Sequence, residues 1–178
     1  TRLIPQRHMI EIIDISIDKP YQVFNKIISK FNDNTPNIYG NDWEKEARKY
    51  VHNISPSYLR TLKDCVKLLK DNNQVVCELG AFLGIVSRCL KEYGFEVNAC
   101  DISSYFGRQE IKNYFRDLKI TIYDFNLRDY SIPFKSKSHD LVIACEVFEH
   151  LNFNPIPVIA EVNRILKIGG YFYVAMPN

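Results

Sequence analysis

The sequence predicts an α/β fold in which helices flank a parallel sheet, and two features carry that prediction. Short apolar segments with strand character alternate with helical patterns from residue 73 onward. This alternation is typical of βαβ units, whose crossovers are right-handed. Acidic residues stand at the carboxyl ends of the first four strand-like segments: Glu78, Asp101, Asp124 and Glu146. Because ligands of such sheets bind beyond these strand ends, we expect a site there.

The first 72 residues are expected to form a helical extension or lid ahead of a main domain that covers 73–178. Apolar residues follow a helical stripe from Pro20 to Phe31. A segment rich in Asn, Asp, Pro and Gly comes next and is predicted to be a loop. Ser55 and Pro56 are typical of an N-cap followed by a first helical position, so a second helix is expected from there to about Lys70.

The main domain is expected to contain five strands and three helices. The strands are predicted at 74–79, 95–100, 119–123, 140–145 and 171–176. The first is β-branched and lacks alternation, as a strand covered on both faces should be. The helices are predicted at 84–93, 103–118 and 155–167, with Gly94 ending the first and the Gly169–Gly170 pair ending the last.

The composition is that of an ordinary soluble domain. Hydrophobic residues make up 46% and charged residues 25% of 178 residues, and the net charge of +2 gives no case for nucleic acid or an anionic membrane. No apolar run approaches the roughly 18 residues of a membrane span, and the N-terminal segment has charges too close to its apolar residues for a secretory signal. The five cysteines lie in apolar segments without C-x-x-C spacing, which predicts buried, reduced thiols in a cytosolic protein.

The stretch "VVCELGAFLG", residues 75–84, indicates what kind of ligand the site takes. Gly80 permits a sharp turn after the strand, and Gly84 permits close approach of the next helix. Phe82 and Ile85 stand where a dinucleotide-binding loop has glycine, so the cradle for a pyrophosphate is missing. Glu78 just before the bend would repel a pyrophosphate and attract a cation. A nucleoside that carries positive charge is therefore favoured over a dinucleotide.

The ends of the next two strands extend this interpretation. Asp101 follows the bend by roughly 20 residues, where nucleotide-binding folds place an acid that accepts from both ribose hydroxyls. Asp124 is positioned to accept from an exocyclic amine of a base, and Phe125 beside it could cover the base's apolar face. The alternative for Asp124 is a turn-forming residue ahead of Asn126.

Five segments, in order, resemble the class I S-adenosylmethionine-dependent methyltransferases. They are "VVCELGAFLG", "EVNACDIS", "ITIYDFN", "HDLVIACEVFEHL" and "AEVNRILKIGGYFYVAMPN", and they cover 73–178. The resemblance implies a Rossmann-like fold with S-adenosylmethionine as cofactor. The sequence departs from the family at Phe82, where glycine is frequent and a side chain would narrow the cofactor pocket, and at Ile168, where proline is frequent.

The same resemblance implies a role for each matching residue. By this resemblance the bend wraps the methionine part of the cofactor with Glu78, Gly80, Phe82 and Gly84. The acid after the second strand, Asp101, binds the ribose, and Ile102 next to it packs on the adenine. The acid after the third strand, Asp124, meets the adenine amine and is followed by Phe125, and the start of the loop after the fourth strand, Cys145 with Glu146, lines the methyl-donor pocket.

The fifth strand-like segment leads to an expectation about partners. Members of the family normally have seven strands, the last two forming an antiparallel hairpin on the fifth, and the sequence ends at "VAMPN". A bare edge such as "YFYVAM" is an aggregation hazard. We therefore expect either a further C-terminal segment or a partner chain to cover this strand.

Candidate bases come from "EVFEHL", where His150 is the most natural base at neutral pH. An alternative is that His150 only braces a loop, as it often does in the family. A second alternative is a divalent metal on Glu146, Glu149 and His150, which would face one way at i, i+3 and i+4 of a helix. The favoured interpretation assigns no metal ligands.

The sequence as a whole predicts a cytosolic enzyme that methylates an O or N atom of a small molecule. A sugar or a quinone-like metabolite is the expected acceptor, the former because "EVFEHLNFNP" resembles enzymes of polysaccharide pathways. Two alternatives stay open: an NAD-dependent oxidoreductase, and a non-catalytic scaffold that lost the cofactor. The N-terminal aromatic residues that could reach the acceptor are Tyr39, Trp43, Tyr50 and His52, although packing is the commoner role for each.

Overall fold

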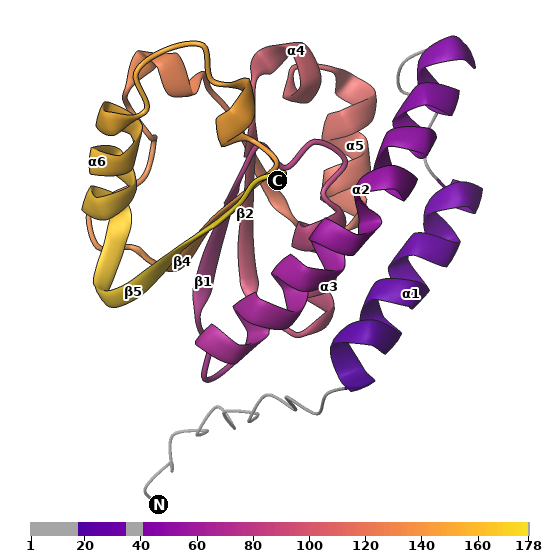
Figure 1. Cartoon of the computed structure of the whole chain (residues 1–178), viewed down its shortest axis with the longest axis horizontal. Coiled ribbons are helices and arrows are strands. Elements are labelled where there is room, and N and C mark those ends of the chain that lie inside the picture. Colours follow the sequence, from indigo (N-terminus) through magenta and orange to yellow (C-terminus); the bar gives the residue numbers. More distant parts are fainter. Residues whose placement is uncertain (1–17, 35–40, 178) are drawn as a thin grey trace, which may run out of the picture.

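A five-stranded, fully parallel sheet forms the centre of the molecule, as predicted (Figure 1). The computed structural model describes residues 18–34 and 41–177. The strands are β1 (Val75–Leu79), β2 (Glu96–Asp101), β3 (Thr121–Asp124), β4 (His139–Cys145) and β5 (Leu166–Ala175), in the spatial order β3-β2-β1-β4-β5. The strand order reverses between β1 and β4, so the carboxyl ends of these two strands mark the switch point at which ligands bind.

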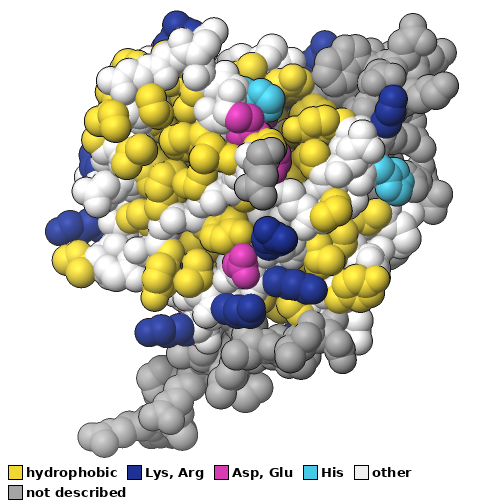
Figure 2. Space-filling model, viewed as in Figure 1, with side chains coloured by type: hydrophobic (Ala, Val, Ile, Leu, Met, Phe, Trp, Pro, Cys, Tyr) yellow, Lys and Arg dark blue, Asp and Glu magenta, His cyan; other side chains and the backbone are white. Residues whose placement is uncertain are grey.

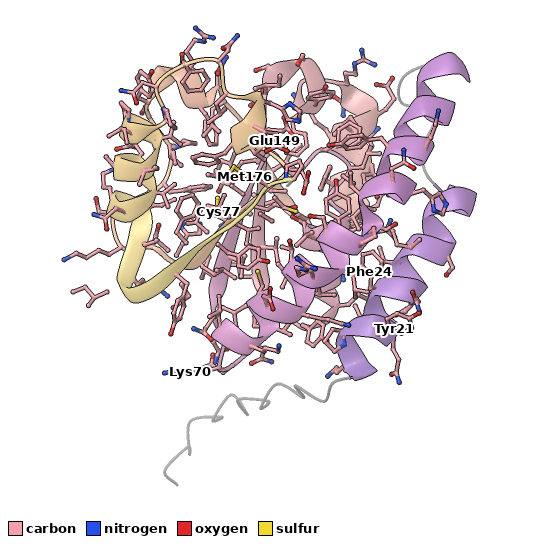
Figure 3. The ribbon with its side chains drawn as sticks, in the orientation of Figure 1. Tyr21, Phe24, Lys70, Cys77, Glu149 and Met176 are labelled. Carbon is pink, nitrogen blue, oxygen red and sulfur yellow. The ribbon has the colours of Figure 1, made fainter. Side chains whose placement is uncertain are left out.

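Helices cover both faces of the sheet. They are α1 (Asp18–Asn34), α2 (Asn41–Leu68), α3 (Ile85–Glu92), α4 (Ser103–Phe106), α5 (Gln109–Asp117) and α6 (Ile156–Ile165), with short 3-10 turns η1 (Leu127–Asp129) and η2 (Phe148–His150). Side chains from α1 to α5 share one core with one face of the sheet, whereas α6 packs on the other face. Phe24 of α1 points into the first core, and Tyr21 lies outside it (Figure 3). Whether 1–72 is a unit of its own stays a prediction.

The second helix differs from its prediction because Pro56 lies inside α2 instead of at its start. Proline has no N–H, so a helix that continues through it leaves the carbonyl four residues earlier without its usual partner. The hydroxyl of Ser55 donates to that carbonyl, on His52, at 2.7 Å. A side-chain hydrogen bond of this kind replaces the missing backbone bond, so the pair that was predicted to start a helix allows one to continue.

The predicted helix at 103–118 is wrong in its continuity, since it is divided into α4 and α5. Gly107 closes α4 against the carbonyl of Ser103, and Arg108 is extended. In one unbroken helix Phe106 and Ile111 would point about 140° apart, since each residue turns the helix by about 100°. The break lets both side chains enter the same core, where both are fully buried.

The end of α6 also differs from its prediction. The helix stops at Ile165, and Gly169 and Gly170 lie within β5 instead of ending the helix. Gly169 has a φ of 81°. Between Leu166 and Tyr171 the strand is irregular, because these residues pair with His139 and Leu141, which are only two positions apart. Glycine at positive φ is the usual residue at such a bulge.

The edge strand β5 and the neighbouring helix α6 expose apolar side chains (Figure 2). These residues are Ile156, Ile159, Ile168, Tyr171, Val174 and Met176. The expectation that a further segment or a partner chain covers β5 stays a prediction. All five cysteines are buried and unpaired, as predicted. Within 18–34 and 41–177, no helix is long and apolar enough to cross a membrane.

Candidate functional site

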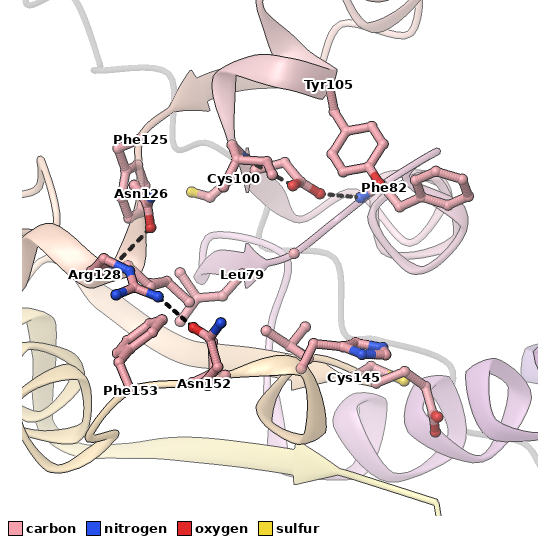
Figure 4. Close-up of a pocket in the computed structure, with 18 of the residues that line it drawn as sticks. Leu79, Phe82, Cys100, Tyr105, Phe125, Asn126, Arg128, Cys145, Asn152 and Phe153 are labelled. Carbon is pink, nitrogen blue, oxygen red and sulfur yellow. Dashed lines mark hydrogen bonds between the residues drawn. The ribbon is translucent and has the colours of Figure 1, made fainter. Parts of the chain in front are cut away.

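A cavity of about 690 Å³ lies at the carboxyl ends of the strands, where the sequence predicted a site. This size is within the usual range for small-molecule sites. Figure 4 shows Phe125, Asn126, Arg128, Asn152 and Phe153 at one end and Phe82, Tyr105 and Cys145 at the other. We call these the first end and the second end. The second end is also lined by Tyr50 and Tyr58 of α2 and by Glu146 and His150 of the loop after β4.

Asp101 lines the cavity and holds the bend after β1. One carboxylate oxygen accepts the backbone N–H of Phe82 and the other accepts that of Ile102, both at 2.8 Å. Burial raises the pKa of the Asp101 carboxyl, although these two hydrogen bonds act in the opposite direction. A carboxylate oxygen can accept two hydrogen bonds, so each still has capacity for a ligand hydroxyl. Asp101 and Ile102 both line the cavity, which fits the roles expected for them.

The glycines of the bend fit close packing as well as a sharp turn. Gly80 and Gly84 have φ values of 68° and 66°. A Cβ on Gly84 would lie 2.5 Å from the ring of Phe115, and one on Gly80 would overlap Val147. Both glycines therefore allow neighbouring elements to approach the loop. Gly80 lines the cavity and Gly84 does not.

Phe82, which stands where the family often has glycine, adopts a φ of 47°. Its ring meets Tyr50 and Tyr105 edge-on, with centroid distances of 5.8 and 5.6 Å. The ring therefore forms part of the wall at the second end, and the cavity keeps its volume of about 690 Å³ beside it. This geometry removes the main observation in favour of a scaffold that lost its cofactor.

Glu78 does not face the cavity, in contrast to the expectation that it attracts a cation. Its side chain is 3% exposed and accepts from both the backbone N–H and the hydroxyl of Ser87. Burial raises its pKa to about 7. Gly84, the N-cap of α3, offers no side-chain acceptor, so Glu78 satisfies an N–H at the start of this helix instead. The physical role of Glu78 is to join β1 to α3 underneath the bend.

Asp124 also lies outside the cavity, with an exposed side chain, whereas Phe125 lines the first end. The turn after β3 is formed by Asn126, whose side chain accepts the N–H of Arg128 at 3.0 Å. Sequence reasoning missed Asn126 as a lining residue. The Asn-x-x-Asp pattern of 126–129, which is typical of a local side-chain turn, could have indicated it.

Two loops close the first end. The guanidinium of Arg128 lies 4.9 Å from the ring centre of Phe153 and donates to the side-chain oxygen of Asn152. Sequence reasoning missed these three residues too. They come together only through tertiary structure, since 24 positions separate Arg128 from Asn152.

The loop after β4 lines the second end. Glu146 has a φ of 57°, lines the cavity and accepts the hydroxyl of Ser57 in α2 at 2.6 Å. Cys145 also lines the cavity, and its sulfur contacts the hydroxyl of Thr61 at 3.3 Å. Burial raises the pKa of the Cys145 thiol to about 11. Both residues thus line the cavity, and their place in a methyl-donor pocket stays a prediction.

His150 lines the cavity with a side chain that is 69% exposed. Its Nε2 lies 3.8 Å from the carboxylate of Glu149. The one-sided helix expected for Glu146, Glu149 and His150 does not form, because η2 begins only at Phe148. In the part of the chain that the structure describes, no three His, Cys, Asp or Glu side chains group as metal ligands would.

Of the N-terminal aromatic candidates, Tyr50 reaches the cavity and His52 is an exposed residue that does not. Tyr39 and the side chain of Trp43 lie outside the described residues. Tyr58 and Tyr105 line the cavity and were not predicted. Tyr58 lies two residues after Pro56, where a helix was expected to begin. The direction of its side chain relative to the cavity could therefore not be predicted from the sequence.

A model of the family described as "Methyltransferase domain" matches residues 77–174. A search of curated proteins found no match. Among solved structures, a protein from Methanococcus maripaludis assigned as an S-adenosyl-L-methionine-dependent methyltransferase is 20% identical, with a TM-score of 0.59 over 73% of this chain and 60% of that one. A protein from Pyrococcus horikoshii OT3 is 25% identical, with a TM-score of 0.50 over 71% and 56%.

A third structure is a complex between the Haloferax volcanii Trm112 methyltransferase activator and an assigned methyltransferase. It is 19% identical, with a TM-score of 0.54, and the match covers 89% of this chain and 60% of that one. The chain thus spans 60% or less of the length of these structures.

Proposed function

The chain belongs to the methyltransferase-domain family, class I of the S-adenosylmethionine-dependent methyltransferases, and we propose that it methylates an O or N atom of a small molecule. S-adenosylmethionine is the cofactor that this family implies. The expected sugar-like or quinone-like acceptor is part of the same proposal. One observation carries it: Asp101 holds the bend after β1 and still offers acceptor capacity to the cavity.

The residues present fit a nucleoside cofactor. Asp101 lies where a ribose diol needs two acceptors, and Ile102 and Phe125 offer apolar surface on the cavity wall for a base. When bound, the cofactor supplies a methyl group that is already activated on a sulfonium, so the protein mainly aligns the reactants.

Two residues of the second end could take a proton from the acceptor, Glu146 and His150. His150 was the base expected from the sequence, and its side chain at the cavity margin is open to solvent, which would let it pass a proton on. Glu146 is the less exposed of the two and is held in place by Ser57.

A calorimetric titration with S-adenosylhomocysteine tests the proposal. Asp101→Asn should weaken this ligand roughly 100-fold, equivalent to about 3 kcal/mol, because charged hydrogen bonds to the ribose are lost. Asp117→Asn, which alters an exposed carboxylate at the end of α5, is the control and should bind as the wild type does.

The same titration separates the alternatives. Tight binding of NAD without binding of S-adenosylhomocysteine would favour an oxidoreductase instead. A protein that binds neither compound would be a scaffold without the cofactor.

A further inference from the structure

The second end of the cavity carries a carboxylate, that of Glu146. Glu146 lines the cavity and accepts from Ser57, and it forms no ion pair with any Lys or Arg whose side chain the structure describes, those within 19–29 and 49–177. The guanidinium of Arg128 lies at the first end, where Phe153 and Asn152 hold it. The second end therefore has negative character that nothing described in the protein neutralises.

A tyrosine hydroxyl is open to the cavity at the same end. Tyr58 is 7% exposed and lines the cavity, and its phenol forms no hydrogen bond with any residue in the described part of the chain. Burial, followed by the charge of Glu78, raises the pKa of Tyr58, so the phenol keeps its proton and can donate. This hydroxyl is therefore available to a polar ligand group at the second end.

Aromatic rings complete this end. Phe82 meets Tyr50 on one side and Tyr105 on the other, and all three line the cavity. Aromatic faces attract cations, and the effect increases when the cation is removed from water. The pKa of Tyr50 is raised by burial and then by the charges of Glu146 and Glu149, which agrees with a negative field here.

The sign of this field discriminates between nitrogen and oxygen acceptors. An alkylamine reaches the protein as an ammonium ion with a pKa near 10 and becomes a neutral nucleophile by losing a proton. A carboxylate stabilises that cation and the methylated ammonium product. An alcohol is a far weaker acid than an ammonium ion, and the alkoxide that it forms on losing its proton is negative, which a neighbouring carboxylate opposes. The same residues thus favour an amine and disfavour a hydroxyl.

We propose that the acceptor is an amine and that Glu146, held by Ser57, binds its ammonium group and takes its proton. The inference rests on the proposed function and narrows its reacting atom to nitrogen. The ammonium proton passes to the Glu146 carboxylate. The nitrogen lone pair then forms a C–N bond to the methyl carbon while the C–S bond breaks and its electron pair returns to sulfur. No further reactant is needed. A sugar-like or quinone-like molecule that bears an amino group satisfies both this inference and the expectation from the sequence.

Glu146→Gln tests the inference, since it removes the charge and retains an oxygen for Ser57. The control is Glu96→Gln, the same substitution at an exposed position at the start of β2, on the opposite edge of the sheet. The probes are 2-phenylethylamine and its matched alcohol, 2-phenylethanol, each titrated by NMR into protein saturated with S-adenosylhomocysteine. The wild type and Glu96→Gln should bind the amine at least tenfold more tightly than the alcohol. Glu146→Gln, likewise saturated with S-adenosylhomocysteine, should lose this preference.

A methylation assay with labelled methyl donor and a panel of primary and secondary amines provides the second readout. The inference is supported if the wild type forms labelled amine products and Glu146→Gln forms them at least 30-fold more slowly. Equal binding of alcohol and amine, no binding of the amine to the wild type, or methylation of the alcohols alone would overturn it. If S-adenosylhomocysteine itself fails to bind the wild type, the proposed function fails as well, so the two failures are distinguishable.

Tyr58→Phe is the second variant, because it removes only the unpartnered hydroxyl and should not disturb folding. It should weaken the binding of the amine at least threefold and leave the affinity for S-adenosylhomocysteine unchanged. S-adenosylhomocysteine and 5′-methylthioadenosine differ by the amino-acid tail. If Tyr58→Phe or Glu146→Gln lowers the affinity for S-adenosylhomocysteine and not that for 5′-methylthioadenosine, the residue binds the amino-acid tail of the cofactor. The inference is then wrong.

Discussion

The two ends of the parallel sheet differ in what their polar side chains contact. At the amino end, the carboxylate of Asp140 accepts from the N–H of Val75 at 2.8 Å and from Lys167 at 2.7 Å. His139 lies between Asn98 and Ser138, with one contact to each ring nitrogen. Lys70, just before β1, lies at this end, and Glu149 and Met176 lie at the other (Figure 3). Asp140 and His139 thus bind the strands at the amino end through partners within the chain.

The carboxyl end instead leaves polar groups open to a ligand. Positive φ outside glycine does not distinguish the two ends, since Phe82 and Glu146 adopt it here and Lys119 and Lys137 adopt it just before β3 and β4. The phenol of Tyr58 has no partner in the described part of the chain, and a cavity of about 690 Å³ lies beside it. Cohesion and binding are therefore separated along the strands. Substitutions at one end should therefore change stability, and substitutions at the other should change affinity, except where a residue serves the packing of the bend.

Gly84 is such an exception and should show the largest effect. Gly84→Ala places a Cβ 2.5 Å from the ring of Phe115 at a φ of 66°, so strain and overpacking add. We expect a loss of about 4 kcal/mol in the free energy of unfolding, measured by urea denaturation. Gly169→Ala is the matched control at the amino end, since its φ is 81° and nothing lies within 4 Å of its Cβ. It should lose only about 1 kcal/mol, and equal losses would show that contact with Phe115 is irrelevant.

Glu78, at the carboxyl end, should make stability fall as pH rises. Its folded pKa of about 7 lies above the unfolded value of 4.5, so the folded state retains a proton that the unfolded state has released. Its contribution is therefore fully present below pH 4.5 and is lost as pH rises to about 7, by about 3 kcal/mol. Glu78→Gln should flatten this slope in melts between these pH values, whereas Glu96→Gln should leave it unchanged. If the slope of stability against pH is unchanged in Glu78→Gln, another titratable group causes it.

His139, at the amino end, should act in the opposite direction. Burial, followed by the charge of Lys167, lowers its pKa from 6.5 to about 4, so the unfolded state binds the proton first as pH falls. Its contribution is fully present above pH 6.5 and is lost as pH falls to about 4, by up to about 3 kcal/mol. His139→Gln should reduce the acid sensitivity of the melting temperature. His52→Gln alters an exposed histidine and should not; equal effects of the two would contradict the prediction.

Asp140 should show the smallest effect and the cleanest separation of the two ends. Burial would raise its pKa, but hydrogen bonds from Lys167 and Val75 lower it overall. Because Lys167 is 41% exposed, the ion pair itself contributes little, and Asp140→Asn should lose about 2 kcal/mol of stability or less. Its affinity for S-adenosylhomocysteine should stay within twofold of wild type in calorimetry. A tenfold loss of affinity would show that the two ends are coupled.

The local sequence pattern was sufficient for prediction where residues close together in the sequence decide the structure. The bend with Gly80 and Gly84 was predicted, because positive φ and close approach are properties that glycine alone provides cheaply. The position of Asp101 at a strand end was also predicted, and the structure places it on the cavity wall. Glu78 and Asp124 show the limit, since both follow the same strand-end rule and neither lines the cavity.

The sequence by itself determined the order of strands and helices, the parallel sheet and the edge of that sheet where a ligand would bind. These follow from apolar periodicity and from glycine, which act over a few residues. Only the tertiary structure decided that α2 continues through Pro56, that Tyr58 and Ser57 reach the cavity, and that Arg128 lies on Phe153. Burial and hydrogen bonding between residues far apart in the chain settle such features, because a carboxylate or hydroxyl takes the nearest partner in space.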